Sequence, residues 1–146
     1  SYRRGKESCG DMDILVTYDT FKTDEDTDGI MSKIINELTI SKLLIQDGTL
    51  TPDAIKKFMG TCKLLKNNSF ARRLDIRLIK SSSYPSALMY FTGSKDFNLK
   101  MRNKAISMNM LLNEYGLFKN DESIHVSSEE DIFKILEEDY IEPTKR

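Results

Sequence analysis

The feature that most constrains this chain is a pair of aspartates at the start of an apolar, β-branched run. Asp11 and Asp13 open the segment Asp11-Met-Asp-Ile-Leu-Val-Thr17, whose later residues are typical of a largely buried strand. Side chains at positions i and i+2 of a strand point to the same face, so the two carboxylates lie side by side, about 6–7 Å apart. Their joint presence costs stability unless a cation lies between them.

A third acid, Asp75, stands in the middle of another predicted strand, residues 72–79. If this strand is the neighbour of the first, three carboxylates meet at one place on the sheet. Oxygen ligands of this kind suit Mg²⁺, and two such ions about 4 Å apart are the usual device for attack of a hydroxyl on a phosphate. The alternative is an accidental surface pair, which the Asp-x-Asp motif alone favours because it is so short.

The residues before the pair change this balance. Ser1-Tyr-Arg-Arg-Gly5 and Cys9-Gly10 supply a hydroxyl, two guanidinium groups and two glycines. Glycine lets a backbone approach a phosphate closely, and arginine offers a fixed fork of donors to phosphate oxygens. A phosphate-binding turn that leads directly into a metal-binding strand is a coherent nucleotide-handling unit. It is not a P-loop, because the Gly-x4-Gly-Lys-Ser/Thr spacing is absent.

The composition narrows the possible chemistry. The 146 residues include one histidine, which nearly excludes a His base, and two cysteines, which make neither a disulfide framework nor a zinc cluster. Catalysis would therefore depend on carboxylates, Arg, Lys and bound metal. No apolar run is long enough to span a bilayer and no signal-peptide pattern is present, so we expect an intracellular protein without a membrane partner.

Hydrophobic periodicity predicts mixed helices and strands in the first half of the chain. Apolar residues at helical spacing indicate a helix over residues 30–38 that packs on the first strand. Further strands are predicted over residues 58–65 and 72–79. Turns are expected at three polar sites: Asp47-Gly48, Thr51-Pro52 and Asn67-Asn68-Ser69.

The pattern changes after residue 80, where we place a subdomain boundary. Helices are predicted over residues 84–90 and 96–108, followed by a hairpin with strands 111–118 and 123–126 that turns at Asn120-Asp121. The last helix is expected to use Ser127 or Ser128 as its cap, Glu130 or Asp131 to complete the capping box, and Pro143 as its stop.

These residues belong to an ordered set of motifs that resembles the family X DNA polymerases, closest in pattern to the beta and lambda types. The motifs are Ser1-Tyr-Arg-Arg-Gly-Lys-Glu-Ser-Cys-Gly-Asp-Met-Asp-Ile-Leu-Val-Thr17, Lys57-Phe-Met-Gly-Thr-Cys62, Arg72-Arg-Leu-Asp-Ile-Arg77, Tyr90-Phe-Thr-Gly-Ser94, Phe97-Asn98, Met101-Arg102, Asn113-Glu-Tyr115, and Glu130-Asp-Ile-Phe133 to Glu142-Pro143. The resemblance implies an α+β fold, with a nucleotidyltransferase-type palm sheet and flanking helices over residues 1–80 and a small α/β thumb-like subdomain over residues 81–146.

The resemblance also implies a reaction. It is template-directed DNA synthesis, in which a dNTP is added to a primer 3′-hydroxyl by a two-metal mechanism during short-gap repair. Asp11 and Asp13 would ligate both metals and Asp75 the catalytic one. The expected cofactors are two Mg²⁺ ions, for which Mn²⁺ can substitute. Expected partners are primer-template or gapped DNA, dNTP and the amino-terminal domains of the same longer chain, in the nucleus or at a site of viral replication.

Further residues receive roles from the same resemblance. Ser1, Arg4 and the Gly10 amide would hold the β- and γ-phosphates of the nucleotide. The incoming sugar and base would contact Tyr90, Phe91, Gly93 and Asn98, with a cis peptide between Gly93 and Ser94. The expected DNA contacts are Lys57, Arg73 and Arg102. A closure switch is implied for Arg77, Phe91, Glu114 and Tyr115, in which Arg77 pairs with Asp13 in the open form.

Two alternatives remain open. The first is a nucleotidyl transferase that needs no template, although Tyr90-Phe91 resembles the templated members rather than terminal transferase, which has Gly-Trp there. The second is a DNA-binding catalytic fragment that is inactive without its missing amino-terminal domains. In addition, Lys95 stands where beta-type enzymes carry an acid that packs against the incoming base.

Overall fold

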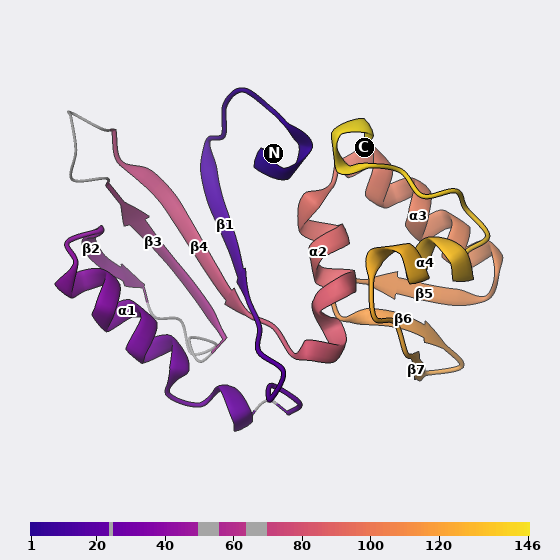
Figure 1. The fold of residues 1–146 in the computed structure, drawn as a ribbon, viewed down its shortest axis with the longest axis horizontal. Coiled ribbons are helices and arrows are strands. Elements are labelled where there is room, and N and C mark those ends of the chain that lie inside the picture. Colours follow the sequence, from indigo (N-terminus) through magenta and orange to yellow (C-terminus); the bar gives the residue numbers. More distant parts are fainter. Residues whose placement is uncertain (24, 50–55, 64–69) are drawn as a thin grey trace. The chain divides into compact units, whose positions relative to one another are not determined.

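The computed structural model of the chain describes residues 1–23, 25–49, 56–63 and 70–146 (Figure 1). Two compact units are present: Gly10–Ser81 form one, and Ser1–Cys9 together with Ser82–Arg146 form the other. The predicted palm subdomain of residues 1–80 differs from this division in its first nine residues, which pack with the C-terminal unit. The turns expected at residues 51–52 and 67–69 lie outside the described residues.

The unit Gly10–Ser81 is built around a four-stranded sheet (Figure 1). Its strands are β1 (Asp11–Val16), β2 (Leu44–Thr49), β3 (Lys57–Cys62) and β4 (Arg72–Leu78), in the order β1-β4-β3-β2. β1 pairs with β4 in parallel, and the other two pairings are antiparallel. The two acid-bearing strands are therefore neighbours, as the convergence of the three carboxylates requires.

The turn expected at Asp47-Gly48 is wrong, because both residues lie within β2. The pairing of β2 with β3 shifts register between Gln46 and Thr49. A bulge of this kind lets a strand continue through an Asp-Gly pair that favours a turn in isolation.

The predicted first helix is confirmed as α1 (Ile30–Ile40), which follows the short 3-10 helix η2 (Glu25–Thr27). Met31 of α1 packs in one core with Phe58, Leu74 and Ile76 from the sheet. The expectation that the first strand is largely buried is wrong for the beginning of β1, where the first four residues are exposed. β1 is an edge strand, so its side chains have neighbours on one side only.

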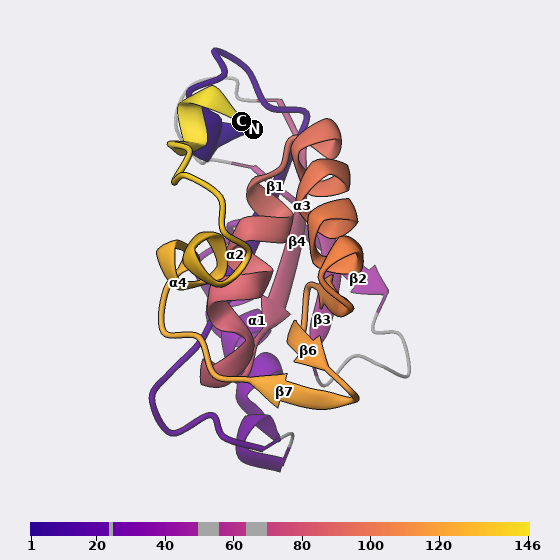
Figure 2. The same ribbon diagram turned by 90° about the vertical axis from the view of Figure 1, so that its right-hand side faces the viewer.

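The second unit packs three helices with a three-stranded sheet (Figure 2). A 3-10 turn, η3 (Ser81–Ser83), leads into the elements α2 (Tyr84–Thr92), α3 (Lys95–Ser107), β5 (Met110–Asn113), β6 (Gly116–Lys119), β7 (Glu122–Ile124) and α4 (Glu129–Ile135). Met101, Leu117 and Ile132 are fully buried in its core. Over the described residues, the helices are too short or too polar to cross a membrane.

The predicted strand over residues 111–118 is wrong, because β5 and β6 form a hairpin within it. The Asn113 side chain causes the reversal: its Oδ1 accepts hydrogen bonds from the backbone N–H groups of Tyr115 (2.9 Å) and Gly116 (3.1 Å). The turn predicted at Asn120-Asp121 is confirmed between β6 and β7, where both residues have positive φ (51° and 63°).

The predicted capping of the last helix is confirmed at Ser128. Its Oγ accepts from the N–H of Asp131 at 3.2 Å. The second bond differs from that of a capping box, because the Asp131 carboxylate accepts from the N–H of Ser127, one residue before the cap, at 2.8 Å. The predicted stop at Pro143 is wrong, because α4 ends at Ile135 and Glu137 adopts positive φ of 55°. Pro143 instead begins the 3-10 helix η4 (Pro143–Lys145).

The two ends of the chain lie side by side in both views (Figures 1 and 2), where η4 contacts η1 (Tyr2–Arg4).

Candidate functional site

The three predicted metal-binding aspartates lie on one face of the sheet. Asp13 is directly opposite Asp75 in the parallel pair β1–β4, and Asp11 is opposite Arg73. Register partners on adjacent strands share a face, and so do positions i and i+2 of one strand. The alternate residues of β4, Leu74 and Ile76, are buried in the core on the other face. Both strands therefore direct their acids away from the core.

Arg73 brings a positive charge to these carboxylates. Its guanidinium donates to Oδ2 of Asp75 at 3.2 Å and lies 3.8 Å from Oδ2 of Asp11. The pair with Asp11 is exposed on both sides, so it adds little to stability. Arg73, which the resemblance assigns to DNA, thus occupies the position of a countercharge in the structure.

Asp75 carries the signs of an unsatisfied ligand. Its side chain is only 9% exposed, and its Oδ1 has no hydrogen-bond partner among the described residues. A buried carboxylate oxygen without a partner is unfavourable, and coordination to a cation would satisfy it. Three carboxylates on one face are also a donor set that suits Mg²⁺.

The acids are not gathered into a closed metal site, however. In the described part of the chain, no group of three or more His, Cys, Asp or Glu side chains is close enough together to hold a metal ion. Binding of a metal by all three aspartates would therefore require Asp11 and Asp13 to draw closer to Asp75 and Arg73 to withdraw from it.

The predicted phosphate-binding residues are divided between the two units. Ser1 and Arg4 belong to the compact turn around η1, where the Ser1 carbonyl accepts from the N–H groups of Arg4 (3.1 Å) and Lys6 (3.3 Å). Gly5 ends this turn with φ of 70°, a left-handed conformation that favours glycine. Gly10 belongs to the sheet unit, directly before β1.

The predicted sugar-binding segment lies at the end of α2. The peptide between Gly93 and Ser94 is cis, as the resemblance implies. The Asn98 side chain donates from Nδ2 to the Tyr90 carbonyl at 2.8 Å, which ties α3 to the last turn of α2. The rings of Tyr90 and Phe91 meet edge to face, with centroids 4.9 Å apart. Tyr90, Phe91, Gly93 and Asn98 are thus neighbours within one unit.

Arg102 and Glu114 both line an open cavity of about 490 Å³ in this unit. Its guanidinium lies 3.6 Å from a Glu114 carboxylate oxygen and 5.0 Å from the centre of the Tyr90 ring. Tyr115, next in the chain, is 67% exposed. Arg102 is thus held between a carboxylate and an aromatic face.

The remaining predicted residues lie in the sheet unit. Arg77 is opposite Leu15 on β1 and Lys57 on β3, and it follows Asp75 by two positions on the same face of β4. The residues of the implied switch are therefore divided, with Arg77 in one unit and Phe91, Glu114 and Tyr115 in the other.

Comparison with known proteins decides the family. Residues 1–81 match the profile described as DNA polymerase beta palm, and residues 87–146 match the one described as DNA polymerase beta thumb. The chain belongs to the family X DNA polymerases.

Three relatives of this family X chain carry two different names. A DNA polymerase lambda of Rattus norvegicus is 34% identical over the whole chain, and one of Arabidopsis thaliana is 27% identical over the whole chain. A DNA nucleotidylexotransferase of Xenopus laevis is 30% identical over 99% of the chain. The matched regions are 27%, 30% and 35% of the lengths of these three relatives, so the chain spans between about a quarter and a third of each.

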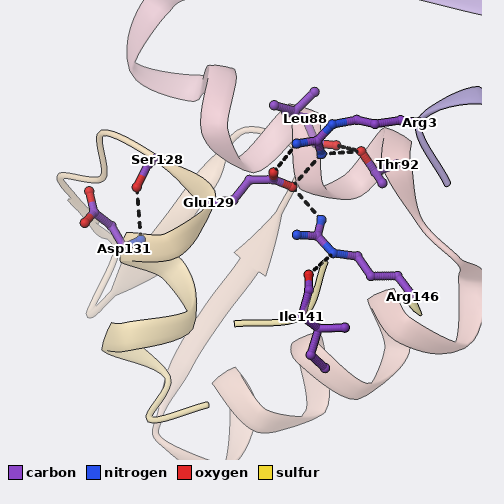
Figure 3. A network of polar contacts seen from close by, with 8 residues as sticks. All are labelled: Arg3, Leu88, Thr92, Ser128, Glu129, Asp131, Ile141 and Arg146. Carbon is purple, nitrogen blue, oxygen red and sulfur yellow. Dashed lines mark hydrogen bonds and ion pairs between the residues drawn. The ribbon is translucent and has the colours of Figure 1, made fainter. Parts of the chain in front are cut away.

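A part-buried polar network of this family X chain was not predicted from the sequence (Figure 3). Glu129 accepts hydrogen bonds from Arg3 and from Arg146. Burial disfavours the charged form of Glu129, but the hydrogen bonds and charges of the two arginines outweigh it and hold its pKa below the usual 4.5. The hydrogen bond to Glu129 in turn raises the pKa of Arg3. The sequence signal for Glu129 is an acid in the first turn of a helix that is capped by serine. This signal does not distinguish a buried acid, because exposed helices also carry acids there.

Proposed function

We propose that the chain catalyses template-directed addition of dNTPs to a primer 3′-hydroxyl, in the filling of short gaps in DNA. The observation that carries the proposal is the register of β1 and β4, which places Asp13 opposite Asp75 with Asp11 on the same face. Membership of family X supports the reaction class. Two of its relatives are named DNA polymerase lambda, which supports the templated form.

In the proposed mechanism, Asp11, Asp13 and Asp75 hold two divalent ions, Mg²⁺ or in its place Mn²⁺. When bound, the ions stabilise the charge that develops on the transferred phosphate and on the departing pyrophosphate. Asp75 helps to accept the proton of the primer 3′-hydroxyl, a role suited to a buried carboxylate whose Oδ1 has no hydrogen-bond partner among the described residues. Arg73 leaves Asp75 and binds the primer phosphate instead.

Each nucleotide-binding residue has its own role in this proposal. Ser1, Arg4 and the Gly10 amide bind the β- and γ-phosphates and stabilise the negative charge of the departing pyrophosphate. Tyr90, Phe91 and Gly93 lie along the sugar, where the ring and the backbone leave no room for a 2′-hydroxyl. Asn98 reaches the minor-groove edge of the incoming base.

Contacts with DNA and closure complete the proposal. Lys57 binds the DNA backbone, and Arg102 leaves Glu114 to reach the template strand. Arg77 pairs with Asp13 in the open form and releases it on closure, and Phe91, Glu114 and Tyr115 are the further residues of this switch. Correct base pairing would thereby control assembly of the metal site.

The second candidate is addition without a template, which the relative named DNA nucleotidylexotransferase favours. A primer offered one dNTP at a time, with and without a gapped template, separates the two candidates. Templated synthesis predicts incorporation of the complementary nucleotide only, and only on the gapped substrate. Addition of any nucleotide to the single-stranded primer would instead identify a terminal transferase.

The carboxylate mechanism is tested with Asp75→Ala. We expect this change to lower the incorporation rate by about 10³-fold, because it removes a ligand and the proton acceptor together. Asp19→Ala, at an exposed aspartate of the same unit, is the control and should match the unchanged chain. Equal incorporation by Asp75→Ala and the unchanged chain would contradict the proposal. Failure of the unchanged chain to extend a primer even with Mn²⁺, with DNA binding retained, would support the inactive-fragment alternative.

A further inference from the structure

We infer that Glu129 is a positioning residue for the triphosphate of the incoming nucleotide and that it acts through Arg3. This inference rests on the proposed function, in which Ser1 and Arg4 bind that triphosphate. The network belongs to the unit that combines Ser1–Cys9 with Ser82–Arg146 (Figure 3). It joins the proposed phosphate turn to helices more than eighty residues away in the chain, because Arg3 is 89 positions from Thr92 and 126 from Glu129.

The first step is the fixed orientation of Arg3. Its two terminal nitrogens donate separately to the two carboxylate oxygens of Glu129, at 2.9 Å and 2.5 Å. Two parallel bonds between a planar guanidinium and a planar carboxylate fix the direction of the side chain as well as its distance. Since Arg3 is adjacent to Arg4 and two residues from Ser1, this also fixes the backbone that presents both proposed phosphate ligands.

The second step is the link from Arg3 to the proposed sugar-binding segment. Arg3 also donates to Oγ1 of Thr92 at 2.8 Å, and that hydroxyl donates to the Leu88 carbonyl at 2.6 Å. Thr92 is the last residue of α2, directly before Gly93. One guanidinium thus connects the turn of the proposed triphosphate contacts with the segment of the proposed sugar contacts.

The third step is the anchoring of Glu129 itself. Arg146 donates to the Glu129 carboxylate at 2.6 Å and to the Ile141 carbonyl at 2.8 Å, and its side chain is 0% exposed. Its guanidinium lies within 5.0–5.6 Å of the centres of three rings, those of Phe97, Phe133 and Tyr140. Because the buried Arg146 guanidinium is held by these rings and by the Ile141 carbonyl, it keeps the Glu129 carboxylate in place. Arg3 is therefore bound to a fixed carboxylate.

The fourth step is the neighbouring Arg4. Its Nε is buried and has no hydrogen-bond partner among the described residues. Buried donors are normally satisfied, and an acceptor supplied by a ligand would satisfy this one. Arg3 therefore uses its side chain to secure the turn, while Arg4 in the same turn keeps a donor available for the proposed phosphate.

The test is Glu129→Gln, which preserves the shape of the side chain and removes its charge. We expect the KM for dNTP to rise about tenfold, because loss of a charge-assisted pair loosens the turn that presents Ser1 and Arg4. The same increase is expected for all four nucleotides, with kcat changed by less than about twofold. The Kd of a non-hydrolysable dNTP analogue should rise in parallel, while the Kd of gapped DNA stays the same. Glu130→Gln, at the exposed neighbour in α4, is the matched control.

The inference is overturned if folded Glu129→Gln binds the analogue as tightly as the unchanged chain. If Glu129→Gln does not fold, Arg3→Lys is measured in the same way, since it keeps the positive charge but cannot form the two parallel bonds. The double variant Arg3→Gln with Glu129→Gln should have the same KM for dNTP as each single variant. A further increase in this KM would contradict the inference that Glu129 acts through Arg3. Failure of the proposed function is seen separately, as equal incorporation by Asp75→Ala and the unchanged chain, and the analogue Kd still tests the role of Glu129.

Discussion

Replacement of Arg146 by methionine should strongly destabilise the chain. The change removes a charge-assisted hydrogen bond of 2.6 Å to Glu129, worth about 1.5–3 kcal/mol, and three contacts with aromatic rings, worth about 0.5–1 kcal/mol each. Methionine fills a similar apolar space and recovers part of this. Glu129 also keeps its pair with Arg3, so the loss lies at the lower end of the range of about 3–5 kcal/mol for a wholly unpaired buried charge. We therefore expect a net loss of about 3 kcal/mol in the free energy of unfolding.

Urea unfolding measures this loss, with Lys145→Met as the control at the exposed neighbouring position. The control should change the free energy of unfolding by less than about 0.5 kcal/mol. If Arg146→Met lies within that same range, the reasoning from burial and pairing is refuted, because a solvated arginine would behave in this way.

The pH dependence gives an independent check of the same argument. The pKa of Glu129 in the folded chain is below its usual 4.5, so ionised Glu129 stabilises the fold above that pH. The contribution disappears as the pH falls through the lower, folded-state value. In Arg146→Met the pKa of Glu129 is lowered less than in the unchanged chain. The difference in the free energy of unfolding between the unchanged chain and Arg146→Met should therefore shrink as the pH falls below 4.5. A difference that is constant with pH would show that packing alone causes the loss.

Two further predictions concern the sheet unit. Gly60→Ala should lower the free energy of unfolding in urea by about 1–3 kcal/mol, because the added Cβ would lie 2.5 Å from the buried ring of Phe58. The control is Gly10→Ala, whose Cβ meets no atom within 4 Å and which should lower it by less than about 0.5 kcal/mol. Equal losses for the two variants would contradict the packing argument. Burial raises the pKa of the Cys62 thiol above 9.0, so iodoacetamide at neutral pH should modify half-buried Cys9 first. Mass spectrometry of the labelled chain decides the order, and faster labelling of Cys62 would show that this part of the core opens.

The elements that could be predicted are those set by short-range patterns. The helix α1 follows from apolar residues three and four positions apart, and the cap at Ser128 follows from a serine with an acid three positions later. The errors occurred where a local polar group overrides the pattern. The Asn113 side chain turns an apolar run into the hairpin β5–β6, and the positive φ of Glu137 ends α4 before Pro143.

What the sequence by itself determined about this protein is its family and the two adjacent acids, because Asp11 and Asp13 are two positions apart on one strand and share a face by backbone geometry alone. Only the tertiary structure decided that Asp75 lies opposite Asp13, because strand order and register depend on how the whole sheet packs. It also decided that Arg3 pairs with Glu129, a contact between residues 126 positions apart. No spacing rule reaches across such a distance, since the cost of closing so long a loop is met by the packing of the entire unit.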